Sequence, residues 1–397
     1  MPRDQMRSKL FTVEYCAMIL LGLFNCLFGQ SSLATLPVLM DSRGVSESIA
    51  AAVNMLFPLA CLFFRRYAVK IGSMVSSKLS IFVCFVVLSV SNIFLDGISD
   101  VGWVIPIRIV QGLAICYIAG VIASLVAETV PSDRFDEGMG YFSIAIPVMS
   151  FFGPALCRIL LANFGYSKML RGLSALMLLP VAISLLTKMP NLKPVEREKT
   201  DKRDPFIEKR SIPASLLLMG SAMAATCTVS FLPLYAQRYA LNHTLYFYMA
   251  AGIGVFGIRI AATIFKRSIP EQNSIPVSIV ILTFVLLVLP VTNNPALSVI
   301  MGILYGMAIG LVQPYLITAA LKSADPAHKS IATVTYYMFN DVGTVAGGML
   351  WGYIAQYISY YAVFMAAAAI NLFTLLGWLV LMKAKSVAVE AAGNHQH

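Results

Sequence analysis

The sequence predicts an all-α integral membrane protein with twelve transmembrane helices in two halves of six. Of its 397 residues, 58% are hydrophobic and only 12% are charged, whereas a soluble chain usually has about 25% charged residues. Apolar segments of about 20 residues recur along the whole chain, and each is long enough to cross a hydrocarbon core ~30 Å thick as a helix. The basic residues, in addition, are distributed unevenly between the connecting loops.

The predicted spans follow one another with short polar connections, apart from one long charged segment in the middle of the chain. They cover residues 10–36, 47–64, 78–95, 102–128, 139–163, 169–187, 213–236, 244–265, 275–292, 296–321, 331–356 and 361–382.

The Lys and Arg residues give an independent indication of topology. With the amino end placed in the cytoplasm, most of the 29 basic residues fall in inner loops and at the two termini. The exceptions are Arg43, Lys168, Arg171 and Arg238 in outer loops and Arg108, Arg158 and Arg259 within spans. This excess follows the positive-inside rule, so both termini are predicted to be cytoplasmic and the protein to lie in the cytoplasmic (inner) membrane. The net charge of +10 then reflects topology and contact with a lipid bilayer, and no nucleic acid partner is expected.

The charged segment KMPNLKPVEREKTDKRDPFIEKRS, from Lys188 to Ser211, has the composition of a solvated linker. It predicts a first six-helix half over residues 1–188, a cytoplasmic linker over 189–212, and a second six-helix half with a short tail over 213–397. A parallel duplication is suggested by matching positions in the two halves. Leu36-Pro37 aligns with Leu232-Pro233, and at a nearly equal spacing Gly112 and Gly153 align with Gly306 and Gly347.

The segment RIVQGLAICYIAGVIASLVAETVPSDRFDEGMGYF, from Arg108 to Phe142, carries the most specific pattern of the chain. Its Arg-x-x-Gln-Gly run, the Pro-x-x-Arg turn at Pro131 and Arg134, and the later Gly153-Pro154 resemble the major facilitator superfamily, in particular its drug- and metabolite-exporting antiporters. SFLPLYAQRYAL at 230–241 and TYYMFNDVG at 335–343 resemble the same group, including metallophore exporters. The resemblance implies the major facilitator fold and transport by alternating access. The loop Val69-Lys70-Ile71-Gly72 departs from the Asp-Arg-x-Gly pattern of the family because it lacks the acidic residue.

Arg108 is the first candidate site residue, since a charged side chain at the centre of a spanning helix costs about 2.5–3.5 kcal/mol. It shares a helix face with Gln111 and Gly112. One reading is a cavity-facing cation that binds an anionic substrate or a carboxylate; the other is a side chain that extends to the outer headgroups.

Asp341 is the second candidate, because it lies near the middle of its predicted span with Tyr337, Asn340 and Thr344 within one turn. Such an acid can load and release a proton as its exposure alternates. The alternative is a structural hydrogen-bonding residue between helices.

The remaining candidates each have a packing alternative. Asn25 and Asn54 line a cavity or contact neighbouring helices; Arg259 contributes to the site or extends to the inner headgroups; Tyr305 lines a substrate pocket or packs in the core. Arg134, Glu128 and Gly72 form an inner gating loop or a solvated turn.

The predicted function is secondary active transport of a small organic solute, with proton-coupled efflux of a drug-like or metallophore-like compound favoured over proton-coupled uptake. A membrane-embedded enzyme is disfavoured, because all four histidines fall in loops or the tail and no two acids lie within one turn at midplane depth. The expected partners are a small-molecule substrate, protons and lipid; no metal and no cofactor are expected, and the protein is predicted to work as a monomer.

Overall fold

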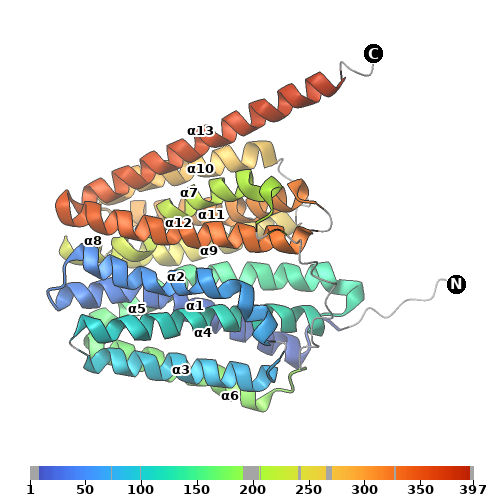
Figure 1. Cartoon of the computed structure of the whole chain (residues 1–397). Coiled ribbons are helices and arrows are strands. Elements are labelled where there is room, and N and C mark those ends of the chain that lie inside the picture. The colour runs from blue at the N-terminus through green and yellow to red at the C-terminus, as the bar shows by residue number, and fades with distance from the viewer. Residues whose placement is uncertain are drawn as a thin grey trace. The chain divides into compact units, whose positions relative to one another are not determined.

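The computed structural model describes residues 9–72, 74–98, 100–190, 205, 207–239, 243–264, 271–325 and 328–393, and these residues are almost entirely helical (Figure 1). The chain forms two compact units: Met1–Leu39 with Leu56–Lys202, and Met40–Met55 with Arg203–His397. Most of the predicted linker, residues 191–204 and 206, lies outside the described residues.

The first half of the chain contains α1 (Val13–Ser42), α2 (Glu47–Gly72), α3 (Ser77–Gly97), α4 (Val101–Thr129), η1 (Ser132–Arg134), α5 (Phe135–Leu176) and α6 (Leu178–Leu186). α5 is interrupted at Gly165, whose φ of 76° is a left-handed conformation that glycine adopts without steric cost. Directly after this break, the Tyr166 hydroxyl donates to the Thr35 carbonyl over 2.7 Å. The break therefore separates the two spans predicted at 139–163 and 169–187.

The second half contains η2 (Lys209–Ser211), α7 (Ile212–Thr226), η3 (Cys227–Phe231), α8 (Leu232–Arg238), α9 (Thr244–Ile264), α10 (Glu271–Val288), η4 (Leu289–Val291), α11 (Pro295–Ser323), α12 (Lys329–Tyr357) and α13 (Tyr360–Gly393). α7, η3 and α8 together occupy one predicted span, and η3 is a π-helical turn within it.

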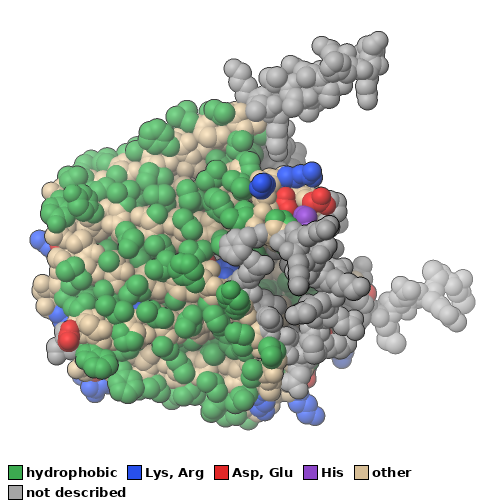
Figure 2. Space-filling view, viewed as in Figure 1, with side chains coloured by type: hydrophobic (Ala, Val, Ile, Leu, Met, Phe, Trp, Pro, Cys, Tyr) green, Lys and Arg blue, Asp and Glu red, His purple; other side chains and the backbone are tan. Residues whose placement is uncertain are grey.

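Ten helical stretches among the described residues are long and apolar enough to cross a membrane. One of them, Glu137–Leu186, is 50 residues long and contains the Gly165 break. α12, with Asn340, Asp341 and Thr344 in its middle, is not among the ten. The all-α membrane fold is confirmed, whereas the count of twelve crossings stays a prediction. Hydrophobic side chains cover much of the visible face of the helices (Figure 2), as expected of surfaces in contact with lipid.

The first part of α2 belongs to the second unit, and polar groups bind it there. The Glu47 carboxylate accepts from Arg238 Nη1 at 3.3 Å and from the Tyr360 hydroxyl at 3.4 Å. The Ser48 backbone N–H donates to Gln356 Oε1 over 3.1 Å. These bonds connect the start of α2 with the ends of α8, α12 and α13.

Glycines bring helix backbones together at corresponding places in the two units. In the first, a Cβ added at Gly153 of α5 would lie 2.9 Å from the Leu27 carbonyl oxygen of α1. In the second, a Cβ added at Gly347 of α12 would lie 2.8 Å from the Met223 carbonyl oxygen of α7. No side chain fits at either position without displacing a helix.

The α2–α4 and α9–α11 pairs show the same type of packing. An added Cβ at Gly112 would collide with the Phe57 carbonyl, and one at Gly306 with the Ala251 carbonyl. The glycine pairs predicted to be equivalent thus make equivalent contacts, which supports the parallel duplication.

Candidate functional site

The Arg108 guanidinium is buried inside the first unit. Its side chain is 0% exposed, and Nη1 donates to Ser32 Oγ of α1 and to Gln111 Oε1 of α4, the latter over 2.9 Å. The guanidinium carbon lies 4.9 Å from the centre of the Phe57 ring of α2, within the range of a cation–π interaction. Arg108 therefore does not extend to the outer headgroups, and the second of its two predicted readings is wrong.

Gln111 continues the polar contacts toward α3. It is also 0% exposed, and its amide nitrogen donates to Ser91 Oγ over 3.0 Å and to Asn92 Oδ1 over 3.4 Å. Ser32, Arg108, Gln111, Ser91 and Asn92, which we call the Arg108 network, join α1, α4 and α3. The i, i+3 spacing of Arg108 and Gln111 places both side chains on one face of α4. Gln111 can therefore bind the guanidinium and the polar side chains of α3 at the same time.

Asn25 lies on α1 and does not join this network. Its side chain is 8% exposed, and among the described residues its Oδ1 has no hydrogen-bond partner. A buried amide oxygen without a partner is costly, so Asn25 is a polar group that a bound solute or water can satisfy. Asn54, which was predicted together with it, belongs to the second unit and is fully buried there.

The Asp341 carboxylate is buried in the second unit, with 6% of its surface exposed. It is the thirteenth of the 29 residues of α12, and so lies near the middle of this helix. Asn340 beside it is half-buried, and its carbonyl accepts from Thr344 Oγ1 over 2.9 Å. Gly343 faces the Met219 backbone of α7, so α12 is held close to α7 at the level of the acid.

Two phenols of α12 lie near an arginine of α9. Tyr337 is 41% exposed, whereas Tyr336 is buried and donates to the Gln313 carbonyl of α11 over 2.8 Å. Arg259 of α9 lies within electrostatic reach of both phenols. The structure thus brings the predicted residues Arg259 and Tyr337 close together, and their role in a site stays a prediction.

Tyr305 occupies a different cluster, built around the π-helical turn. Its hydroxyl lies 2.7 Å from Thr228 Oγ1, and the Tyr248 hydroxyl donates to the Thr228 carbonyl over 2.7 Å. π-Helical turns recur at functional sites, because the extra residue exposes backbone groups that side chains or ligands can bind. Tyr305 is 2% exposed, so it packs inside the cluster and does not present its hydroxyl to an open pocket.

The predicted gating residues lie at the ends of helices. Arg134 binds Glu137 through two hydrogen bonds, Nε to Oε2 over 2.9 Å and Nη2 to Oε1 over 2.7 Å. The pKa of the Arg134 guanidinium is raised above its ordinary value, chiefly by these bonds to Glu137. Glu128 is exposed at the end of α4, and Gly72 is the last residue of α2. An Arg134–Glu137 pair at i, i+3 stabilises the first turn of α5.

Several residues of these clusters were not predicted. Ser91 and Asn92 are consecutive polar residues in an otherwise apolar span, a signal that was present in the sequence. Thr228 and Tyr248 gave no such signal, because an apolar segment often contains single residues of these types. Among the described residues, no group of three His, Cys, Asp or Glu side chains is placed to hold a metal ion.

The apolar helices, the backbone-to-backbone glycine contacts and the buried ionisable side chains define an integral membrane protein of the solute-transporter class. The profile of the Major Facilitator Superfamily matches residues 18–348, and the chain belongs to this family. The resemblance found in the sequence is therefore confirmed at the level of the family. It follows that the protein is a transporter and not an enzyme.

Solved structures of known transporters share the fold. A point mutant of the nucleoside transporter NupG superimposes with a TM-score of 0.75 at 14% identity, covering 93% of this chain and 99% of that one. A POT family transporter in complex with a thioalcohol-conjugated peptide gives 0.74 at 11% identity, covering 93% and 96%. A POT family transporter in complex with 5-aminolevulinic acid gives 0.73 at 10% identity, covering 92% and 95%. No curated protein sequence matches the chain. At these identities the likeness extends to the fold alone.

Proposed function

We propose that the protein is a proton-coupled secondary transporter of a small organic solute, with Asp341 as the proton carrier and efflux by antiport as the direction. The single observation that carries the proposal is the burial of the Asp341 carboxylate in the middle of α12. A carboxylate at membrane depth is retained only where it is paired, wetted or protonated during part of a cycle. Alternating access supplies these conditions in turn.

Arg108 has the complementary role in this proposal. Its network fixes a buried positive charge within the first unit, where Ser32 and Gln111 are its neutral partners. When the network opens, the guanidinium can bind an anionic or zwitterionic solute through its two-pronged donor geometry. Asn25 of the same unit, with its buried amide oxygen, supplies a further polar contact for the solute.

The proposed setting follows from the charge distribution of the sequence. The protein lies in the cytoplasmic membrane as a monomer, in two six-helix halves over residues 1–188 and 213–397 with the linker between them. Both termini and the linker face the cytoplasm, the side on which most Lys and Arg residues fall.

The test uses purified protein in liposomes with an imposed pH gradient. A panel of lipophilic cationic dyes, nucleosides and short peptides is assayed for accumulation, and an internal pH indicator reports proton movement. Antiport predicts accumulation inside vesicles whose interior is acidic, whereas symport predicts accumulation when the exterior is acidic. A dependence on the second gradient alone would replace efflux by proton-coupled uptake.

The residue-level test is Asp341→Asn, which keeps the size and hydrogen-bonding capacity of the side chain and removes its titration. We expect loss of gradient-driven accumulation, with downhill exchange of the same compound retained. Asp100→Asn is the matched control, because Asp100 is an exposed N-cap of α4 and Asn caps equally well. If Asp341→Asn still concentrates the compound against its gradient, the proton moves through another group.

A further inference from the structure

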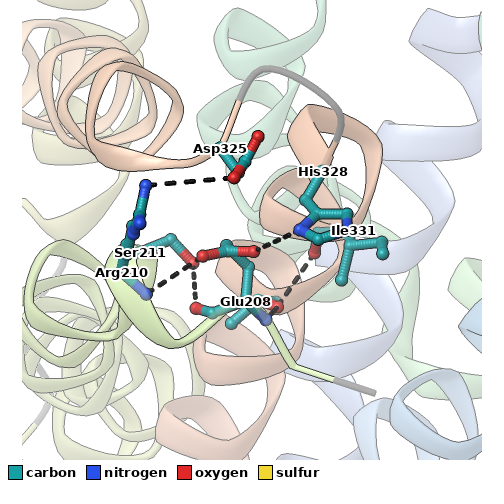
Figure 3. Close-up of polar contacts among 7 residues, drawn as sticks. Glu208, Arg210, Ser211, Asp325, His328 and Ile331 are labelled. Atoms are coloured by element: carbon teal, nitrogen blue, oxygen red, sulfur yellow. Dashed lines mark hydrogen bonds and ion pairs between the residues drawn. The ribbon is translucent and has the colours of Figure 1, made fainter. Parts of the chain in front are cut away.

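Glu208, the last residue before η2, is buried although it belongs to the charged segment that precedes α7. Its side chain has 7% of its surface exposed, and Oε2 lies 3.2 Å from Nδ1 of His328. The other carboxylate oxygen, Oε1, accepts from the Arg210 backbone N–H over 3.2 Å. The dashed lines in Figure 3 show that both oxygens are in use. The carboxylate thus connects the residues before α7 with the residue that precedes α12.

A second contact reinforces the first. The backbone N–H of Glu208 donates to Thr335 Oγ1 over 3.1 Å, and Thr335 is 0% exposed in the second turn of α12. The Glu208 carbonyl in turn accepts from Ser211 N and Ser211 Oγ, at 3.1 and 2.8 Å. Residues 208–211 therefore form a closed turn. Its first residue, Glu208, binds His328 through its side chain and Thr335 of α12 through its backbone.

Several charged residues lie on the elements around His328. Charged residues on the adjoining elements are Lys209 and Arg210 of η2, Lys322 at the end of α11, Asp325 after it, and Lys329 at the start of α12. Arg210 is directed to Asp325, with 4.0 Å between Nη1 and Oδ2, and both side chains are largely exposed. The guanidinium is thus paired with Asp325, and among the described residues the imidazole of His328 forms the ion pair with the buried carboxylate.

We propose that Glu208, His328 and Thr335 form a proton-sensitive clamp that fastens the end of the segment before α7 to the start of α12. Histidine is the side chain whose charge ordinarily changes between about pH 5 and 8. When His328 is protonated, the buried carboxylate has a cationic partner and the clamp is tight. A neutral imidazole supplies no counter-charge, and the clamp is then looser because a buried charge without a counter-charge is costly.

Hydrogen–deuterium exchange of the purified full-length protein in lipid nanodiscs tests the clamp without a substrate or a gradient, so the outcome does not depend on the proposed function. The amides of Ile207–Ser211 and Lys329–Thr335 are measured at about pH 6 and 8, on either side of the ordinary histidine range, with correction for the chemical pH dependence of exchange. We expect exchange to be about tenfold slower at the lower pH, the size of one charge-assisted hydrogen bond.

Four variants separate the clamp from general loosening. His328→Gln and Glu208→Gln should abolish the difference between the two pH values. Asp325→Asn, which removes the exposed partner of Arg210, should keep it. Thr335→Val removes the backbone anchor, so exchange should be faster at both pH values while the pH difference remains. Wild-type exchange that does not change with pH, or a pH difference that survives in Glu208→Gln, would overturn the proposal.

Discussion

The contact between α9 and α11 predicts opposite effects for two alanine substitutions three residues apart. At Gly254, an added Cβ would collide with the Ile303 carbonyl oxygen and lie 3.1 Å from the Met307 backbone nitrogen. At Gly257, which is exposed, nothing lies within 4 Å of the added atom. Both residues are inside the same helix, so Gly257→Ala is a matched control for Gly254→Ala.

The magnitudes follow from two terms. Replacing glycine by alanine in a helix stabilises it by about 0.8–1.0 kcal/mol, and this term is common to both variants. Inserting a methyl group into a tightly packed contact typically costs about 1–3 kcal/mol, and only Gly254→Ala incurs this cost. Gly257→Ala is therefore expected to be as stable as the wild type or slightly more stable. Gly254→Ala should be less stable than Gly257→Ala by about 1–3 kcal/mol, because the common term cancels in this comparison.

The chain provides its own reporter for the assay. Cys61, Cys116, Cys157 and Cys227 are buried thiols, which become reactive toward a thiol-specific dye as the helices separate. Denaturant titration of both variants in mixed micelles then gives the unfolding free energies. Equal stability of the two variants, or a more stable Gly254→Ala, would mean that α9 and α11 are not in backbone contact at this position.

Two further predictions use the same assay. Arg108→Ala should lower the unfolding free energy by about 1–3 kcal/mol because Ser32 and Gln111 lose their donor. Arg108→Lys should recover part of this loss. An unfolding free energy of Arg108→Ala equal to that of the wild type would show that the Arg108 network does not hold α1, α3 and α4 together. Trp351→Phe should cost about 1–3 kcal/mol because it removes the 2.8 Å hydrogen bond from Nε1 to the Met223 carbonyl. Trp378→Phe in α13 controls for the change in ring size, and an equal loss in both variants would contradict the role of this bond.

The helices could be predicted because their apolar length is a property of the local sequence. The predicted span 296–321 corresponds to α11 (Pro295–Ser323), and 331–356 corresponds to α12 (Lys329–Tyr357). The break at Gly165 was also within reach, since it falls in the short connection between two predicted spans. The π-helical turn Cys227–Phe231 was not, because an extra residue in a helical turn leaves the hydropathy unchanged. In the structure the indole of Trp351 binds the Met223 carbonyl just before this turn, a contact between distant segments of the chain.

The candidate site, too, could be predicted from the sequence only in part. Arg108 and Gln111 were found from their spacing on one helix, which sequence alone reveals. Their partners Ser32, Ser91 and Asn92 come from α1 and α3, and which residues face each other there depends on the registers of packed helices. Glu208 was missed for a related reason, since a glutamate in a charged segment is usually solvated. Its burial results from contacts with residues more than one hundred positions away.

A comparison of the two halves distinguishes residues that helix packing requires from residues that are proposed to serve transport. Gly112 and Gly306 meet the carbonyls of Phe57 and Ala251 in the same manner, so the packing of these helix pairs is common to both halves. In the alignment that makes these glycines equivalent, the position that corresponds to Arg108 is Gly302, where an added Cβ would collide with the Phe247 carbonyl.

In the same alignment, Asp341 corresponds to Pro147. Arg108 and Asp341 are therefore buried ionisable side chains at positions where the other half has an uncharged residue. The helix pair of the second half packs with glycine at the position that corresponds to Arg108, so packing alone does not require an arginine there. Burying a charge at membrane depth is also costly. The common packing accounts for the helices and not for Arg108 or Asp341, and this supports the proposal that these two side chains carry the transport chemistry.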